Sequence, residues 1–193
     1  MVKLTPLQSP IDPMRCMGNW YVHRSIPTPL DSNVFNGLEE YTWNEEAQRV
    51  QVKYTYNAGS LDGPAGVVYQ RGWVKDKKLG TTWGVSPKIG PFHLPFTLPY
   101  YILDIDTKDY SYIVCAGTPG PWVRRAPPPV ASGRVPRDLG RIRPHAVAAA
   151  ERQAYVLTRS TKPPADADLK KWLAVLEGAG LPMSKLETVE HRQ

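Results

Sequence analysis

Residues 49–57, RVQVKYTYN, place an apolar or aromatic side chain at every second position. Because successive side chains of a β-strand point to opposite faces of a sheet, this period predicts a strand with one buried face. Similar runs recur at short spacing, separated by turn-forming stretches such as NAGSLDG and DTKD. Together they predict eight strands, at residues 18–25, 38–43, 49–57, 67–75, 81–86, 100–105, 110–116 and 154–159.

One helix signal follows the last strand. The stretch KPPADADLKKWLAVLEGAGLP places four apolar side chains on one helical face: Leu169, Trp172, Leu173 and Leu176. We expect Asp166 to cap this helix, and Gly178 or Gly180 to end it. The pattern predicts an all-β fold, an eight-stranded antiparallel up-and-down β-barrel with one C-terminal α-helix packed outside. Such a barrel has room for side chains or for one small ligand.

The basic charge is concentrated in one segment. Residues 121–153 hold seven Arg and two acidic residues, and so carry +5 of the net charge of +6. A triple proline at 127–129 excludes both helix and sheet ladder there. We interpret 121–153 as a Pro-, Arg- and Ala-rich insertion, mostly disordered, within a single domain of residues 1–193. The remaining chain lacks the charge pattern of a nucleic-acid-binding protein, so nucleic acid is not an expected partner.

Motifs of catalysis are missing from the sequence. The four His, at 23, 93, 145 and 191, have no metal-ligand spacing, and there is no P-loop, nucleophile elbow or dinucleotide fingerprint. The adjacent carboxylates Glu39 and Glu40 should point to opposite faces of a strand, and cannot share a site. Cys16 and Cys115 match no metal or redox spacing, which predicts free thiols. We therefore expect no enzymatic activity, no metal and no cofactor.

Targeting signals are also missing from the sequence as given. No run of residues is long and apolar enough for a membrane span, and the first residues lack the apolar centre of a secretory signal. The expected location is cytoplasmic or peripheral to a membrane.

Three short motifs resemble the signatures of the lipocalins. GNWY (18–21) resembles the first, DTKDYSY (106–112) the second and YVLTRS (155–160) the third, and they occur in the order of that family. With the helix and LPMSKLETV that follow, the chain resembles the subgroup of bacterial lipocalins, apolipoprotein D and plant temperature-induced lipocalins. The resemblance covers nearly the whole chain except 121–153. It implies carriage of a small hydrophobic or amphipathic ligand, such as a fatty acid, lysophospholipid, sterol or carotenoid, and a role in stress responses.

The same resemblance implies a structural plug at one end of the barrel. It places Gly18 at a tight turn, Trp20 in the closed end, and Arg159 stacked across the Trp20 indole, a cation–π contact. The implied plug residues are Gly18, Trp20, Asp106, Tyr110 and Arg159. The alternative is that Trp20 is one more aromatic residue of the core.

Strand parity then indicates which side chains line the interior. If Trp20 points inward, Val22 and Arg24 should do so too. On residues 67–75 one parity offers Tyr69, Arg71 and Trp73 and the other Val68, Gln70 and Val74; we favour the first for its aromatic residues. The predicted ligand-binding residues are Val22, Arg24, Val52, Tyr54, Tyr56, Tyr69, Arg71, Trp73, Trp83 and Val85. Arginines near the mouth would suit an acidic head group, or would be solvated at the rim.

Residues 87–101, PKIGPFHLPFTLPYY, combine four prolines with apolar side chains. Proline at this density keeps a segment out of sheet ladders, so the pattern predicts a loop at the barrel mouth. Its exposed apolar side chains would be Phe92, Leu94, Phe96 and Leu98. This loop resembles the Pro-rich loop of plant temperature-induced lipocalins, which implies peripheral membrane contact; the alternative is a lid over the entrance.

Two functions from different classes fit this sequence. The first is a carrier of a small hydrophobic ligand near a membrane. The second is an interaction protein whose Arg-rich insertion recruits an anionic partner, which would show steeply salt-dependent binding. The sequence does not determine the oligomeric state.

Overall fold

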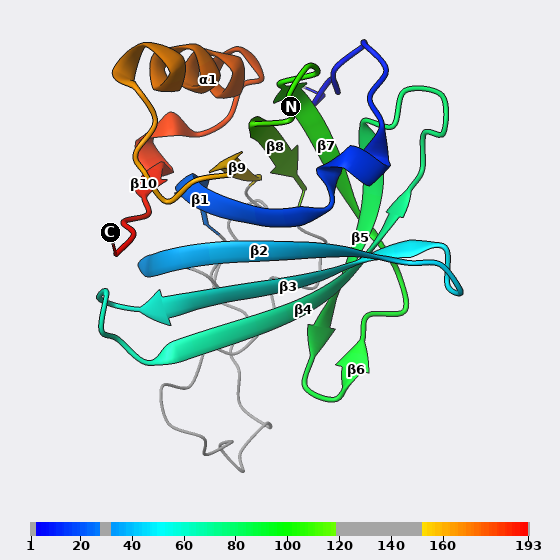
Figure 1. Ribbon diagram of the computed structural model, residues 1–193, viewed down its shortest axis with the longest axis horizontal. Helices are drawn as coiled ribbons and strands as arrows, with labels where there is room; N and C mark the ends of the chain where they lie inside the picture. Colours follow the sequence, from blue (N-terminus) through cyan, green and yellow to red (C-terminus); the bar gives the residue numbers. More distant parts are fainter. Residues whose placement is uncertain (1–2, 28–31, 119–151, 193) are drawn as a thin grey trace, which may run out of the picture.

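The computed structural model describes residues 3–27, 32–118 and 152–192, which form a closed antiparallel β-barrel (Figure 1). Each barrel strand pairs with the next along the chain, and β9 pairs with β1 to close the ring. The barrel strands are β1 (Gly18–Ile26), β2 (Val34–Asn44), β3 (Arg49–Ala58), β4 (Ala65–Val74), β5 (Thr82–Ile89), β7 (Leu98–Ile105), β8 (Tyr112–Gly117) and β9 (Gln153–Thr158). The predicted eight-stranded up-and-down barrel is confirmed.

Short elements complete this barrel. The two-residue strand β6 (Phe92–His93) forms a hairpin with β5, and β10 (Glu187–Thr188) pairs with the second half of β1. Among the described residues, two 3-10 helices flank the barrel: η1 (Pro13–Cys16) and η3 (Met183–Lys185). The α-helix α1 (Asp166–Gly178) follows β9.

The helix α1 packs on the outer surface of the barrel. Trp172 and Leu176 are buried against Val114 of β8 and Val156 of β9, in a cluster separate from the barrel interior. Because alternate residues of β8 and β9 are buried on both faces, these strands read as continuous apolar runs. The predicted external packing of the helix is confirmed.

The predicted N-cap of α1 is wrong. Ala165 is the capping residue, with an extended backbone and no side-chain hydrogen bond, and Asp166 is the first helical residue. Asp166 and Asp168 instead lie in the first turn, where their charges favour the positive end of the helix dipole. The helix ends at Gly178, and Gly180 has a left-handed φ of +68°.

The loop expected at residues 87–101 is partly wrong. β5 continues to Ile89 and β7 begins at Leu98, so Pro87 and Pro99 lie within strands, opposite Gln70 and Gly84. Strands tolerate proline where its missing N–H leaves no ladder hydrogen bond unmade. The segment is therefore a hairpin. In an up-and-down barrel it lies at the same end as the connections β1–β2 and β3–β4.

A β-bulge changes the parity of β1. The pairing between β1 and β9 shifts between Val22 and Arg24, so His23 is an extra residue. Beyond it, Arg24 pairs with Val156 of the outer cluster, whereas Ser25 pairs with Tyr155 of the inner cluster. The expectation that Arg24 faces the interior is therefore wrong, because the inserted residue reverses the alternation.

The bulge residue His23 is buried between β1, β9 and the C-terminal segment. Its Nε2 lies 2.9 Å from both the Thr158 hydroxyl and the Ser160 carbonyl, and its ring centroid lies 5.1 Å from that of His191. The pKa of His23 is lowered to about 4, chiefly because its ring is buried. The Ser160 hydrogen bond opposes this shift, and the neighbouring His191 and Arg24 add to it. The folded protein therefore holds His23 neutral.

We predict that His23 makes the protein less stable in mild acid. Between an ordinary pKa of 6.5 and a folded pKa of about 4, the unfolded chain binds a proton that the folded chain does not. The contribution of the neutral His23 to the free energy of unfolding is thus complete above the unfolded pKa, and it is lost as the pH falls toward the folded pKa. Urea unfolding between about pH 7 and about pH 4.5 should show a smaller loss of stability for His23→Gln than for the wild type. Equal losses would contradict the prediction; His93→Gln, with a less buried ring, is the control.

Candidate functional site

One end of the barrel is sealed by Trp20 and Arg159. Trp20 is fully buried, and its indole N–H donates to the Cys16 carbonyl at 2.7 Å. The Arg159 guanidinium lies over the Trp20 ring, 3.5 Å from its centroid. Gly18 has a φ of +100°, and a Cβ there would lie 3.2 Å from Arg159 Nη1, so glycine permits both the turn and the close approach.

Arg159 also joins separate segments through backbone carbonyls. Its three nitrogens donate to the carbonyls of Tyr110, Asn19 and Arg15, at 3.2, 2.9 and 2.9 Å. The charged group thereby makes several hydrogen bonds without a carboxylate. The start of β1, η1 and the β7–β8 turn are held together by one side chain.

The β7–β8 turn is shaped by Asp106. Its carboxylate accepts hydrogen bonds from the backbone of Lys108 and Asp109 and from the Ser111 hydroxyl, the last at 2.6 Å. The Ser111 hydrogen bond is the main cause that lowers the pKa of Asp106. The turn places Tyr110 in a left-handed conformation, with its hydroxyl accepting from the Asp12 backbone at 2.7 Å.

The interior of the barrel is lined by aliphatic and aromatic side chains. From the predicted ligand-binding set, the inner cluster contains Val22, Val52, Tyr54 and Trp83, with Tyr56 and Val85 partly buried against it. Strand parity alone did not identify several further buried members, which come from β2, β7, β8 and β9: Tyr41, Tyr100, Cys115 and Tyr155.

A chain of buried polar groups crosses this interior. Tyr41 donates to the Glu39 carboxylate at 2.5 Å, the Tyr41 and Tyr100 hydroxyls lie 3.3 Å apart, and Tyr100 donates to the Cys115 sulfur at 2.7 Å. Burial raises the pKa of both phenols well above the ordinary value and also raises that of the Cys115 thiol. Cys115 is therefore a weak nucleophile. The Ser25 hydroxyl is also buried, with no hydrogen-bond partner among the residues that the structure describes.

The parity chosen for β4 is wrong. The inward-facing Val50, Val52 and Tyr54 of β3 pair with Gly72, Gln70 and Val68 of β4. The alternative set of Val68, Gln70 and Val74 therefore faces inward. The first set, Tyr69, Arg71 and Trp73, faces the outside, and Tyr69 is 46% exposed. The aromatic residues of β4 therefore cover the outer surface.

Two glycines explain this parity. A Cβ at Gly66 would collide with the Tyr56 ring, and Gly72 lies between Val50 and Trp83. Large interior side chains of the neighbouring strands thus occupy the space above the glycines, as in other sheets where an aromatic ring covers a glycine. In the sequence, Gly66 and Gly72 are the residues that could have indicated which face of β4 points inward.

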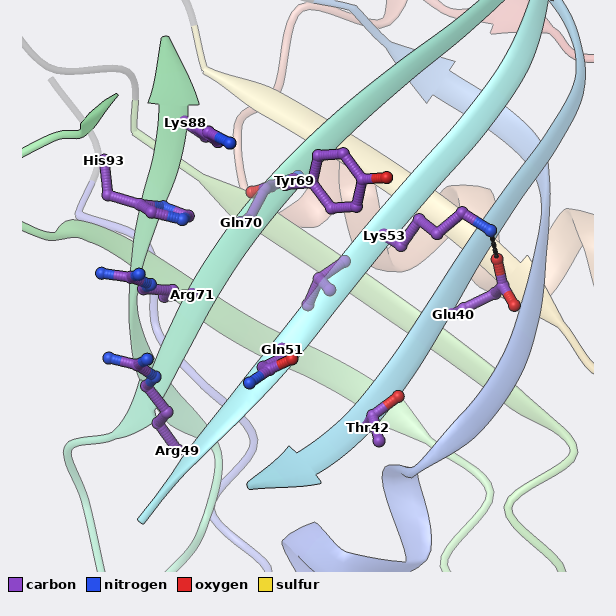
Figure 2. Close-up of a pocket in the computed structure, with 11 residues that line it drawn as sticks. Glu40, Thr42, Arg49, Gln51, Lys53, Tyr69, Gln70, Arg71, Lys88 and His93 are labelled. Carbon is purple, nitrogen blue, oxygen red and sulfur yellow. Dashed lines mark hydrogen bonds and ion pairs between the residues drawn. The ribbon is translucent and has the colours of Figure 1, made fainter. Parts of the chain in front are cut away.

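The outward-facing residues of β4 line a surface pocket of about 400 Å³ (Figure 2). The close-up shows Arg49, Arg71, His93 and Lys88 in a row along its edge, from β3, β4, β6 and β5. On the other side Lys53 pairs with Glu40 at 2.8 Å. The remaining lining residues are Thr42, Gln51, Val52, Tyr69 and Gln70.

The hairpin beside this pocket exposes apolar side chains. Phe92 of β6 is 76% exposed and Phe96 is 41% exposed, whereas Leu94 and Leu98 are half-buried. A second pocket, of about 290 Å³, lies between Trp73 and the segment of Leu94, Pro95 and Phe96.

The proposed insertion lies almost wholly outside the described residues, and Gln153, placed within it, belongs to β9. Its interpretation stays a prediction. In the described part of the chain, both cysteines are free thiols, and no cluster of three or more His, Cys, Asp or Glu is placed to hold a metal ion. No helix in these same ranges has the length and apolar character needed to cross a membrane.

An eight-stranded antiparallel barrel with one sealed end and an aromatic interior defines the class of small barrels that hold side chains or a single ligand. A family model described as a lipocalin-like domain matches residues 11–121, more than half of the chain. The chain therefore belongs to the lipocalin family. The narrower subgroup stays a prediction, and a comparison with curated proteins finds no match.

Solved lipocalin structures share this fold. Insecticyanin from the tobacco hornworm Manduca sexta superposes with a TM-score of 0.66 at 13% identity, covering 99% of this chain and 86% of its own. Lobster apocrustacyanin A1 gives a TM-score of 0.59 at 13% identity, and the match covers 98% of this chain and 91% of the apocrustacyanin chain. The cockroach allergen Per a 4 gives a TM-score of 0.58 at 16% identity, and the match covers 98% of this chain and 94% of the allergen chain. At these identities the likeness establishes the fold alone.

We predict that Trp20→Ala lowers the free energy of unfolding by about 3–5 kcal/mol, the range for truncating a large buried aromatic residue. The variant also leaves Arg159 without its ring partner. Equilibrium denaturation measures the loss, and Trp43→Ala, at a half-buried interior position, should cost less. A loss below about 1 kcal/mol for Trp20→Ala would show that Trp20 does not seal this end.

Proposed function

We propose that this lipocalin binds and carries a small hydrophobic or amphipathic molecule in its barrel interior, close to a membrane surface. A fatty acid, a lysophospholipid, a sterol and a carotenoid remain the candidate ligands. The observation that carries this proposal is the aromatic interior of a lipocalin barrel. Valines, tyrosines and Trp83 line it, and a hydrogen-bonding chain runs through it.

The interior chemistry changes which head group we favour. Arg24 and Arg71 would suit an acidic head group only if they faced the interior, but both face outward. The inner surface offers the Ser25 hydroxyl, which has no hydrogen-bond partner among the described residues, beside the Tyr41 and Tyr100 hydroxyls, which already pair within the interior. These groups suit a ligand with one neutral hydroxyl or carbonyl, because a buried hydroxyl gains most from a hydrogen-bond partner. A sterol or a carotenoid fits this chemistry better than a fatty acid.

The exposed hairpin supports the membrane part of the proposal. A phenylalanine that is 76% exposed is not folded over the barrel entrance, which favours an interacting surface over the lid. Aromatic side chains at such a tip match the interfacial region of a bilayer. A stress-response role is a further prediction of the subgroup resemblance.

We predict that Val52→Phe weakens ligand binding at least tenfold. Val52 faces the interior and is almost fully buried, so an added ring occupies space that a ligand would use. Quenching of tryptophan fluorescence by a fluorescent sterol, with a fluorescent fatty acid as the second probe, measures affinity. Gln51→Phe, on the same strand but facing outward, is the matched control and should stay within threefold.

Overpacking costs about 1–3 kcal/mol, so folding of Val52→Phe must be checked by its melting temperature. Where it fails to fold, Val85→Phe adds the same ring at a partly buried position. Saturable binding that neither interior substitution changes would place the ligand outside the barrel. No saturable binding of either probe would remove the carrier function.

We predict that replacing Phe92, Leu94 and Phe96 with Ser weakens association with phosphatidylcholine vesicles and leaves the fold intact. The substitutions remove apolar area that would enter the interfacial region, and Phe92 makes little contact with the protein. Vesicle flotation measures association, and the melting temperature checks folding. Unchanged flotation would remove the role of this hairpin in membrane contact.

A further inference from the structure

Cationic side chains from three adjacent strands converge on the outer pocket. Arg49 comes from β3, Arg71 from β4 and Lys88 from β5, and Figure 2 shows all three on the same edge as His93. Burial of the His93 ring is the main cause that lowers the pKa of His93, and the charges of these three cations lower it as well. Their fields therefore overlap at one place on the surface.

These cations lack acidic partners. Among the described residues, no carboxylate lies within ion-pair distance of Arg49, Arg71 or Lys88, while the carboxylate that lines the pocket, Glu40, is already paired with Lys53. The Nε of Arg49 is buried and has no hydrogen-bond partner in the same part of the chain. Leaving a buried N–H of a charged group without a hydrogen bond is costly, and this points to a bound acceptor.

Aromatic rings lie beside the cations of this pocket, and Tyr69 is one of its lining residues. Lys88 Nζ lies 5.8 Å from the centroid of Tyr69, and the Arg49 guanidinium lies 5.9 Å from that of Trp73. These contacts hold the long side chains near one another without neutralising their charges. The volume of about 400 Å³ falls within the range of roughly 300–1,000 Å³ that is typical of small-molecule sites.

The pocket adjoins the exposed apolar hairpin. Lys88 and His93 belong to the same β5–β6 hairpin as Phe92, and Trp73 borders both the cationic residues and the second pocket with Phe96. Cations beside exposed aromatic side chains are the combination that binds anionic bilayers, since lipid phosphates attract the former and the interfacial region accommodates the latter.

We propose that Arg49, Arg71, Lys88 and His93 form a binding site for the phosphate of an anionic membrane lipid, on the outside of the barrel. The lipid stays in the bilayer, and its head group enters the pocket while the hairpin inserts. This inference rests on the membrane contact of the proposed function, and adds to it a charge-selective site that is separate from the ligand in the interior.

The test compares vesicles of phosphatidylcholine alone with vesicles that also contain phosphatidylglycerol, using the full chain in a flotation assay. We expect the wild type to prefer the anionic vesicles. The double variant Arg71→Gln, Lys88→Gln should bind anionic vesicles roughly 30-fold more weakly, about fivefold per charge removed, and should bind phosphatidylcholine vesicles unchanged. The matched control, Lys77→Gln with Lys78→Gln, removes the same charge from exposed positions outside the pocket and should change binding less than threefold.

Each other outcome overturns the inference. Equal losses in the two double variants would mean that only net charge matters. No preference for anionic vesicles would remove the site, even if the hairpin variant still shows that the protein contacts membranes. Binding of inorganic phosphate that is tighter than binding to anionic vesicles would assign the pocket to free phosphate, and tighter binding to a short DNA duplex would assign it to nucleic acid.

Two readouts separate this inference from the proposed function. Binding to phosphatidylcholine vesicles reports the apolar hairpin, and sterol binding reports the interior, so either can fail while the charge selectivity holds. Melting temperatures check that both double variants are folded. If Arg71→Gln with Lys88→Gln is unfolded, the single variant Arg49→Gln gives the same comparison, with an expected loss of about fivefold on anionic vesicles.

Discussion

The contact between Arg159 and Trp20 fixes the closed end of the barrel, on which the rest of the structure depends. A guanidinium 3.5 Å from an indole centroid is held there by three carbonyls from separate segments. Its planar fork makes these hydrogen bonds with little loss of freedom, which lysine could not reproduce. Gly18 is required because any side chain would approach this guanidinium. With one end fixed in this way, the opposite end carries the longer connections and the exposed hairpin.

The regular part of the fold follows from local alternation, and could be predicted wherever one face of a strand is apolar. The run Val50, Val52, Tyr54 illustrates this, since its period is unbroken and all three side chains are buried. The prediction failed where two factors compete. In β4 the aromatic residues face outward because Gly66 and Gly72 make room for larger neighbours, and a period-two pattern alone gives both parities equal weight.

The β-bulge and the contacts between side chains of different strands could not be predicted from the sequence. The bulge at His23 reverses which side chains of β1 face inward, and no turn-forming residue marks it. Glu39 illustrates a second limit: its opposite orientation to Glu40 could be predicted, but its hydrogen bond from Tyr41 depends on the interior around both residues. The outer pocket depends on the register of β3, β4 and β5, so its cations, up to 39 positions apart in sequence from Arg49 to Lys88, meet only in the folded barrel.

The barrel separates two kinds of chemistry by the two faces of the same strands. In β3, Val52 and Tyr54 face the interior, while Gln51 and Lys53, between them in sequence, face the outer pocket. A lipid phosphate outside and a neutral ligand inside would therefore be bound largely by alternate residues of one strand. Because the sheet is one layer thick there, the two sites are close in space yet chemically independent. Under the proposed function, this arrangement lets the protein approach an anionic bilayer without exposing its interior ligand to the charges that hold it there.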